Sequence, residues 1–210
     1  KTKHRLRTRG TPKGGVMAPI QWNLAFDSML KQCDKNKNTE GYGYADDACL
    51  VTTACKAETA RKNMQTAVDK CVTWGDKNGL KFSPKKTVVV LFTRKNKYVR
   101  PNGKIIMNGT EVDYSDNVRY LGVHMDSKLN WRHHIKTKIN NARAQLFKMR
   151  NALGIAWGLK PHLLRWVYTC VVRPAISYGS VVWAHAITTK GQRTDLRRLN
   201  GTALRMMCPK

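Results

Sequence analysis

The chain of 210 residues is short of acidic side chains: it contains 13 Asp or Glu against 39 Lys or Arg, which gives a formal net charge of +26. Such an excess of one sign destabilises a compact monomer by self-repulsion unless a polyanion offsets it, so nucleic acid is the leading expected partner. The shortage is uneven: residues 127–210 hold 16 basic residues and a single acid, Asp195, whereas residues 1–126 hold 23 basic and 12 acidic residues. The composition therefore predicts that the C-terminal part binds a nucleic-acid backbone.

Metal-binding cysteine motifs and long apolar runs are also missing. The six cysteines include no Cys-x-x-Cys pair, which argues against a zinc site or a disulfide framework and favours reduced core residues. The longest apolar run, 167–183, is broken by Arg173 and Pro174, so no membrane partner is expected. No signal peptide opens the sequence, and the first residue is Lys, so we expect an intracellular protein and a piece of a longer chain.

Two adjacent aspartates, Asp46 and Asp47, interrupt an apolar, strand-like run at residues 41–51. Neighbouring side chains on a strand point to opposite faces, so the pair can serve one ligand only if the backbone turns between them. Residues 44–47 are therefore predicted to form the tip of a hairpin. Its carboxylate oxygens suit Mg²⁺ or Mn²⁺, which take further ligands from water and substrate phosphates. The alternative is a merely solvated Asp-Asp turn, the usual role of an isolated pair.

A loop rich in Gly and Pro, residues 10–19, precedes a predicted helix at 20–30. Glycines let a backbone approach a phosphate, and a helix N-terminus offers free N–H groups, but this signal is weak on its own and a plain loop is the simpler interpretation. The basic residues 1–9 are predicted to form either an edge strand or a solvated arm.

The middle of the chain alternates helical and strand patterns. Apolar residues spaced by threes and fours predict a helix over 56–78 that ends at Gly79. Strands are predicted at 80–82, 88–92 and 118–123, and a type I′ hairpin around Asn108-Gly109 within 104–112. The basic turn 83–87 is either solvated or directs a lysine at phosphate.

The last third of the sequence has mostly helical periodicity. A long helix is predicted over 135–153, and a further helix from Pro161 that Pro174 stops or kinks. We therefore predict an α+β fold with a domain boundary near residue 126: a mixed part, 1–126, and a helical part, 127–210.

The order of the motifs resembles the C-terminal half of a reverse transcriptase from the non-LTR retrotransposons of the jockey, R1 and LOA-like group. These motifs are Gly-Thr-Pro-x-Gly-Gly (10–15), Pro-x-x-x-Asn-Leu (19–24), Tyr-Ala-Asp-Asp (44–47), Gly-Leu-x-Phe (79–82), Lys-Thr (86–87) and Tyr-Leu-Gly (120–122). Residues 129–131, 157–161 and 171–179 also read like the last part of these enzymes. RNA-virus polymerases and group II intron maturases share parts of the pattern, but the former usually have Gly-Asp-Asp instead of Ala45-Asp46-Asp47.

The resemblance implies a right-hand polymerase, with part of the fingers and palm over 1–126 and a helical thumb and the start of a downstream connection over 127–210. It implies two-metal nucleotidyl transfer with Mg²⁺ or Mn²⁺ on Asp46 and Asp47, and Lys86, or Lys85, at the phosphates. Other roles follow in the same way: a nucleotide and template pocket from Gly10, Pro12, Lys13 and Gly14, and a primer grip from Tyr120, Leu121 and Gly122.

The implied partners are an RNA template and a DNA primer, with the RNA/DNA duplex held on the thumb, in a ribonucleoprotein of nucleus and cytoplasm. Two positions depart from the family pattern: Lys13 stands where Gln is usual, and Ala18 where Ser is usual. The family also needs an upstream aspartate, in a motif that would precede Gly10, and we expect that missing polymerase segment to be required for activity. The alternative is a truncated, catalytically inactive remnant that binds nucleic acid through its charge.

Overall fold

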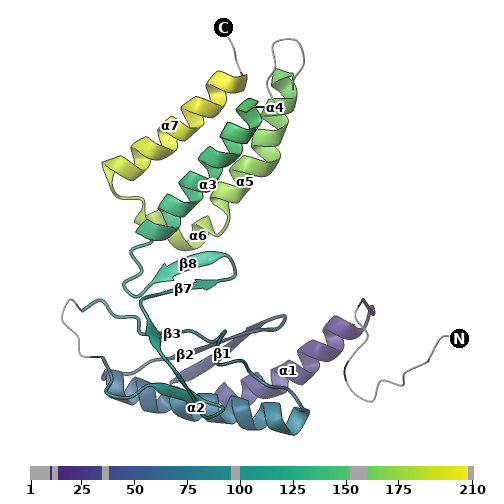
Figure 1. Ribbon diagram of the computed structural model, residues 1–210, viewed down its shortest axis with the longest axis vertical. Helices are drawn as coiled ribbons and strands as arrows, with labels where there is room; N and C mark the ends of the chain where they lie inside the picture. Colours follow the sequence, from purple (N-terminus) through teal and green to yellow (C-terminus); the bar gives the residue numbers. More distant parts are fainter. Residues whose placement is uncertain (1–9, 11–13, 35–37, 96–99, 152–159, 208–210) are drawn as a thin grey trace, which may run out of the picture. The chain divides into compact units, whose positions relative to one another are not determined.

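Helices and short paired strands alternate through the first half of the chain, and helices dominate the second half (Figure 1). The computed structural model describes residues 10, 14–34, 38–95, 100–151 and 160–207. Their backbone contacts divide them into an N-terminal unit, up to residue 91 together with 95–115, and a C-terminal unit, 92–94 together with 116 onwards. The predicted α+β class is confirmed. The division falls at residue 115, so the hairpin that follows belongs with the helices.

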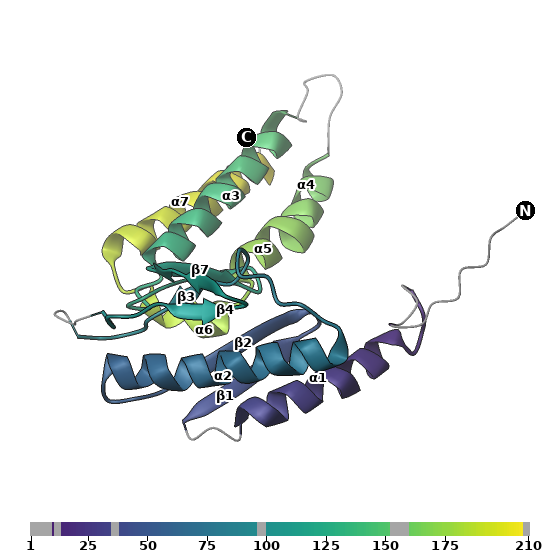
Figure 2. The same ribbon diagram turned by 60° about the horizontal axis from the view of Figure 1, so that its bottom comes forward.

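The N-terminal unit combines two long helices with short strand pairs. In chain order its elements are α1 (Ala18–Asp34), β1 (Thr39–Tyr44), β2 (Asp47–Thr52), α2 (Ala57–Asn78), β3 (Val89–Val90), β4 (Ile105–Met107), β5 (Thr110–Val112) and β6 (Tyr114–Ser115). β1 pairs antiparallel with β2, and β4 with β5, whereas β3 pairs parallel with β6. Figures 1 and 2 both show α1 and α2 beside the β1–β2 hairpin.

Two glycines of β1 let α1 lie directly on the hairpin. A Cβ placed on Gly43 would lie 2.8 Å from Cδ1 of Phe26, and one on Gly41 would lie 3.1 Å from Cδ2 of Leu30. Any larger side chain at Gly43 would therefore push the helix away. The Gly-x-Gly spacing puts both glycines on one face of the strand, since alternate residues share a face.

Helix α2 follows the predicted periodicity and ends as predicted. Gly79 is its C-cap in the left-handed region at φ 69°, where glycine has no steric cost. Two buried clusters flank the helix. The cluster that joins it to α1 contains Phe26, Met29, Cys33, Cys71 and Trp74. The cluster that joins it to the β4–β5 hairpin contains Val68, Ile105, Met107 and Val112.

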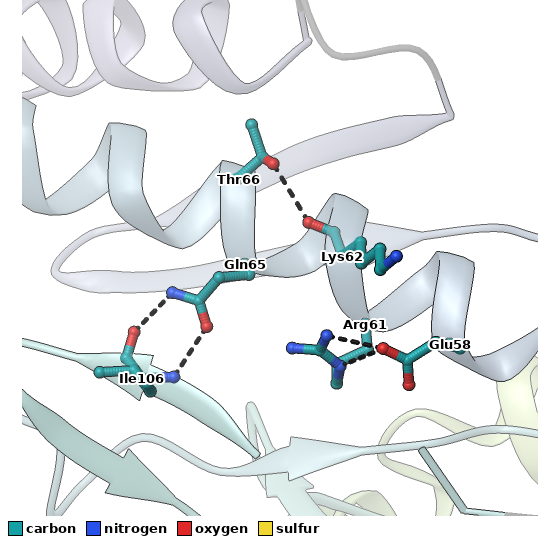
Figure 3. A network of polar contacts seen from close by, with 6 residues as sticks. All are labelled: Glu58, Arg61, Lys62, Gln65, Thr66 and Ile106. Carbon is teal, nitrogen blue, oxygen red and sulfur yellow. Dashed lines mark hydrogen bonds and ion pairs between the residues drawn. The ribbon is translucent and has the colours of Figure 1, made fainter. Parts of the chain in front are cut away.

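A glutamine of α2 fixes the edge of β4 (Figure 3). The side-chain amide of Gln65 donates to the carbonyl oxygen of Ile106 at 2.8 Å, and its oxygen accepts the N–H of Ile106 at 2.8 Å. One turn earlier, Arg61 donates through two nitrogens to Oε1 of Glu58, at 2.8 and 2.6 Å. The glutamine thus pairs with the strand as another strand would, and it orients the β4–β5 hairpin on α2.

The C-terminal unit contains one hairpin and a group of helices. Its elements are β7 (Asn117–Tyr120), β8 (Val123–Asp126), α3 (Arg132–Asn151), α4 (Pro161–Val167), a π-helical segment (Tyr168–Val172), α5 (Arg173–Ser177), α6 (Ser180–Trp183), a 3₁₀ turn (Ala184–Ala186) and α7 (Lys190–Met207). β7 and β8 pair antiparallel. The faces of α3, α4 and α7 meet in a core that includes Ala142, Leu146, Leu164, Val172, Leu199 and Ala203.

Proline 174 does not stop the helix that begins at Pro161. A π-helical segment, Tyr168–Val172, comes immediately before it, and helical geometry continues through α5 to Ser177. A proline has no N–H to donate, and its ring clashes with the carbonyl group of the preceding turn. A π-bulge accommodates both the missing donor and the ring. In place of the predicted stop or kink, the structure has a local widening of the helix before Pro174.

Three smaller predictions differ from the structure. Residues 80–82 form no strand, because Leu80 donates its N–H to the carbonyl oxygen of Gly75 and completes the cap of α2. Residues 118–123 form a hairpin and not a single strand. Cys33 and Cys71 are buried as predicted, but Cys55 and Cys170 are exposed.

The hairpin around Asn108-Gly109 is confirmed, with positive φ at both residues. Within the described part of the chain, no helix is both long and apolar enough to cross a membrane. The N-terminal arm 1–9 lies outside the described residues.

Candidate functional site

The two aspartates lie at the tip of the β1–β2 hairpin, as predicted. Tyr44 pairs with Asp47 across the hairpin, and Ala45 and Asp46 form the turn between them. Ala45 has a φ of 51°, in the left-handed region that reverses the chain. Both aspartates are exposed, and neither carboxylate makes an ion pair or hydrogen bond with another described residue. The tip therefore presents its oxygens to solvent.

Helix α1 supports the hairpin tip through a hydrogen bond and ring contacts. Nε1 of Trp22 donates to the carbonyl oxygen of Ala45 at 2.6 Å, directly beside Asp46. The Trp22 ring stacks on Phe26, with centroids 5.4 Å apart, and Phe26 lies against Gly43. These contacts connect the turn to the core of the N-terminal unit, so the carboxylates lie on a supported strand end.

The hairpin has two different faces. Residues that pair across the strands share a face, so Gly41 and Gly43 lie with Leu50 and Ala48 on the side of α1. Asp47 lies on the opposite face with Tyr42, Tyr44 and Val51, whose side chains are exposed. On this second face, the residues near the tip are exposed, whereas Cys49, which pairs with Tyr42, is half-buried.

The donor set fits a hard divalent cation in part. Two exposed carboxylates supply oxygen ligands of the kind that Mg²⁺ and Mn²⁺ prefer, and Mg²⁺ usually completes its shell with water and substrate phosphates. However, no group of three or more His, Cys, Asp or Glu that could hold a metal occurs within the described residues. Asp46 and Asp47 can therefore contribute to a metal site, and further ligands must come from elsewhere.

The predicted pocket loop is described only at its ends. Gly10 and Gly14 both have positive φ, 82° and 84°, which explains glycine at both positions. Pro12 and Lys13 lie outside the described residues. After the loop, α1 begins at Ala18, whose N–H donates to the carbonyl oxygen of Gly15 at 3.1 Å.

The predicted phosphate lysine lies in a tight turn of the N-terminal unit. The N–H groups of Lys86 and Thr87 both donate to the carbonyl oxygen of Ser83 at 3.1 Å, and the side chains of Lys85 and Lys86 are exposed. Either lysine is free to reach an anionic ligand. The geometry does not favour one lysine over the other.

The predicted primer-grip residues form the turn of the β7–β8 hairpin. Tyr120 ends β7 and pairs with Val123, while Leu121 and Gly122 form the turn with φ of 47° and 78°. Two successive positive φ values are typical of a type I′ turn, which suits the twist of an antiparallel hairpin. The Tyr-Leu-Gly motif therefore ends in a tight, defined loop.

A buried histidine, which the sequence did not single out, anchors the same hairpin. Nδ1 of His134 accepts the backbone N–H of His124 in β8 at 3.1 Å, and His134 is fully buried. Its ring lies edge-on to Trp131 and Trp183, and Nε2 has no hydrogen-bond partner among the described residues. Burial, followed by the positive charge of Lys138, lowers the pKa of His134 to about 4. Only the three-dimensional placement of Trp183 beside α3 reveals this environment.

Comparison with known proteins assigns a family to this architecture. The family model described as reverse transcriptase (RNA-dependent DNA polymerase) matches residues 1–125. The chain belongs to the reverse transcriptase family. The match includes the β1–β2 hairpin and its two aspartates, and it ends inside β8 of the second hairpin. The resemblance that the motif order indicated is thereby confirmed.

Several relatives come from retrotransposons of insects. The chain is 26% identical over 202 residues to a "Retrovirus-related Pol polyprotein from type-1 retrotransposable element R1" of Nasonia vitripennis, which covers 93% of the chain and 58% of that protein. It is 26% identical over 190 residues to the "RNA-directed DNA polymerase from mobile element jockey" of Drosophila funebris, with 86% and 20% covered. A probable RNA-directed DNA polymerase from transposon BS of Drosophila melanogaster is 25% identical over 213 residues, with 98% and 23% covered.

The chain spans 58% or less of the length of these reverse transcriptase relatives. Their similarity extends through the C-terminal unit, beyond the part that the family model matches. No solved structure matches the chain.

Proposed function

We propose that this chain supplies the metal-binding hairpin and the helical thumb of an RNA-directed DNA polymerase from a non-LTR retrotransposon. The observation that carries the proposal is the supported β1–β2 tip with Asp46 and Asp47 exposed, within a chain of the reverse transcriptase family. In this interpretation, residues 1–126 are part of the fingers and palm, and residues 127–210 are the thumb and the start of a connection.

Asp46 and Asp47 would bind the divalent cations, Mg²⁺ or Mn²⁺, together with a carboxylate from an upstream polymerase segment. Two such ions, when bound, stabilise the charge on the attacking and leaving oxygens of the phosphoryl transfer. The hairpin contributes position: Trp22 holds the carbonyl of Ala45, and Gly43 lets α1 lie against the strand, so the backbone that carries the two carboxylates is supported.

Basic residues would bind the anionic substrates. Lys86, or its neighbour Lys85, lies on an exposed turn from which it can approach the phosphates of a nucleotide. Gly10 and Gly14, together with Pro12 and Lys13, would shape the nucleotide and template pocket.

The C-terminal unit would hold the RNA/DNA duplex. Only one acid, Asp195, occurs among residues 127–210, and Arg143 already pairs with it at 3.0 Å. The excess of positive charge in this part of the sequence would neutralise backbone phosphates. The turn Leu121–Gly122, with Tyr120, would contact the primer strand.

Primer extension tests the proposed function. A polymerase that contains this chain together with its upstream segment should extend a DNA primer on an RNA template when Mg²⁺ is present. Asp46→Asn should abolish extension, because it removes a charged metal ligand. Asp27→Asn is the matched control: Asp27 is an exposed carboxylate of α1, paired with Lys31 at 2.6 Å, and its loss should leave extension unchanged. Equal extension by Asp46→Asn and the unaltered polymerase would contradict the assignment.

The second candidate function is a catalytically inactive remnant that binds nucleic acid. The charge of +26 favours it as strongly as it favours the polymerase. Salt-sensitive duplex binding by the complete protein, without Mg²⁺-dependent extension by the unaltered form, would support the remnant over the enzyme.

A further inference from the structure

A tyrosine of the C-terminal unit reaches the turn of the β7–β8 hairpin. The hydroxyl of Tyr178 donates to the carbonyl oxygen of Leu121 at 2.9 Å. A Cβ placed on Gly122 would lie 3.5 Å from Cε1 of the same ring, so the tyrosine lies against both residues of the turn. The two partners are 57 residues apart in sequence, and no motif linked them.

The tyrosine is itself held from several sides. Nζ of Lys138 lies 4.9 Å from the centroid of its ring and also donates to the carbonyl oxygen of Ala175 at 3.2 Å. Nε1 of Trp183 donates to the carbonyl oxygen of Tyr178 at 3.1 Å. The ring and the backbone of Tyr178 are therefore both fixed to the helices.

The next residue brings the helices close to β8. Gly179 has a φ of 68°, and a Cβ placed on it would lie 3.2 Å from Cγ2 of Val123. Both the left-handed backbone and the close approach require glycine here. The Tyr178-Gly179 pair thus joins the α5–α6 corner to the hairpin at its turn.

This contact contributes more to orientation than to stability. Tyr178 is 52% exposed, so it buries little apolar surface, and a single hydrogen bond to a carbonyl in contact with water contributes little to folding. Its geometric effect is larger, because the Leu121 carbonyl lies inside a two-residue turn whose φ values leave few alternatives.

The surroundings of the turn favour an anionic ligand. Arg119 lies on β7, one residue before Tyr120, and Lys138 lies over the Tyr178 ring. Burial first, and then the charge of Arg119, lower the pKa of the Lys138 ammonium. A phosphate near the turn would offset this repulsion between like charges.

We propose that Tyr178 is a positioning residue for the primer strand: its hydroxyl holds the Leu121 carbonyl and so orients the Leu121–Gly122 turn toward the primer backbone. The role of the turn at the primer rests on the proposed function, whereas its orientation by Tyr178 does not.

The test uses two tyrosine hydroxyls of the same unit. Tyr178→Phe removes only the bond to Leu121, and Tyr168→Phe removes only the 2.6 Å bond to Oδ1 of Asn200, which lies on α7 and not on the hairpin. In the polymerase that contains this chain, Tyr178→Phe should raise the KM for primer–template about fivefold with kcat within about twofold, and Tyr168→Phe should change neither. A merely structural role would give the two variants the same kinetics.

Amide hydrogen exchange in the 210-residue chain provides a readout that needs no activity. Tyr178→Phe should accelerate exchange at Val123, which pairs with Tyr120 across the turn, and Tyr168→Phe should not. Unchanged exchange at Val123 in Tyr178→Phe would overturn the positioning role. Faster exchange with an unchanged primer–template KM, in a polymerase that Asp46→Asn inactivates, would overturn the link to the primer. If Asp46→Asn stays active, the proposed function fails, and the exchange result still decides whether Tyr178 orients the turn.

Discussion

Lowering the pH from 7 to 5 should destabilise the C-terminal unit through one buried side chain, His134. Its Nδ1 accepts the N–H of His124, so the neutral ring carries its proton on Nε2. A protonated Nδ1 could not accept this hydrogen bond, and its own N–H would face the N–H of His124. It would also place a charge in a fully buried site between Trp131 and Trp183, near the cation of Lys138.

The pKa difference gives the size and the sign of the effect. The pKa of His134 falls from 6.5 to about 4 in the folded chain, so unfolding takes up a proton at intermediate pH. Stability from this group is complete above pH 6.5 and is lost as the pH falls toward 4. The linkage relation gives a loss of about 2 kcal/mol between pH 7 and pH 5, and about 3 kcal/mol at pH 4.

Urea unfolding at pH 7 and pH 5, followed by helical circular dichroism, measures this loss. His134→Asn keeps an acceptor for the His124 N–H but cannot titrate, so its stability should change less between the two pH values than that of the unaltered chain. His162→Asn is the matched control, because His162 is exposed and its replacement should leave the pH dependence intact. The same loss of stability in the unaltered chain and in His134→Asn would refute the assignment of the effect to His134.

Two predictions concern the N-terminal unit. In a urea titration, Gly43→Ala should destabilise this unit by about 1–3 kcal/mol, because the new Cβ overlaps Phe26. Gly191→Ala is the control: Gly191 lies in a helix with open space around it, and its replacement should not destabilise the chain. Gln65→Ala should cost about 1–2 kcal/mol through the loss of both bonds to Ile106, visible as faster amide exchange at Ile106; exchange equal to that of the unaltered chain would contradict it.

The strongly patterned elements could be predicted from the sequence. The periodicity of α2, the glycine that ends it, the Asn108-Gly109 turn and the Tyr44–Asp47 tip all depend on local chemistry, and the structure has each of them. Local signals suffice here because spacing, capping and turn preference act within a few residues.

Other features depend on contacts between distant segments, which a single sequence does not reveal. Leu121 is a non-glycine residue with positive φ, so nothing local marked 118–123 as a hairpin; the turn is held by Tyr178 and the strand by His134. Gly43 is glycine because Phe26 lies against it. The exposed Asp46–Asp47 tip could be predicted from the sequence, but the described residues contain no group of three or more possible metal ligands, so the proposed metal site stays a prediction.

The central claim is that the hairpin carboxylates bind the catalytic metal, and the rate of single-nucleotide addition tests it most directly. The measurement uses the polymerase that contains this chain, saturated with RNA template and DNA primer, in a single turnover over a range of Mg²⁺ concentrations. Asp46→Asn should lower the rate of addition at least about 100-fold, equal to about 3 kcal/mol of transition-state stabilisation, without weakening primer–template binding. A rate equal to that of the unaltered polymerase at every Mg²⁺ concentration would contradict the claim.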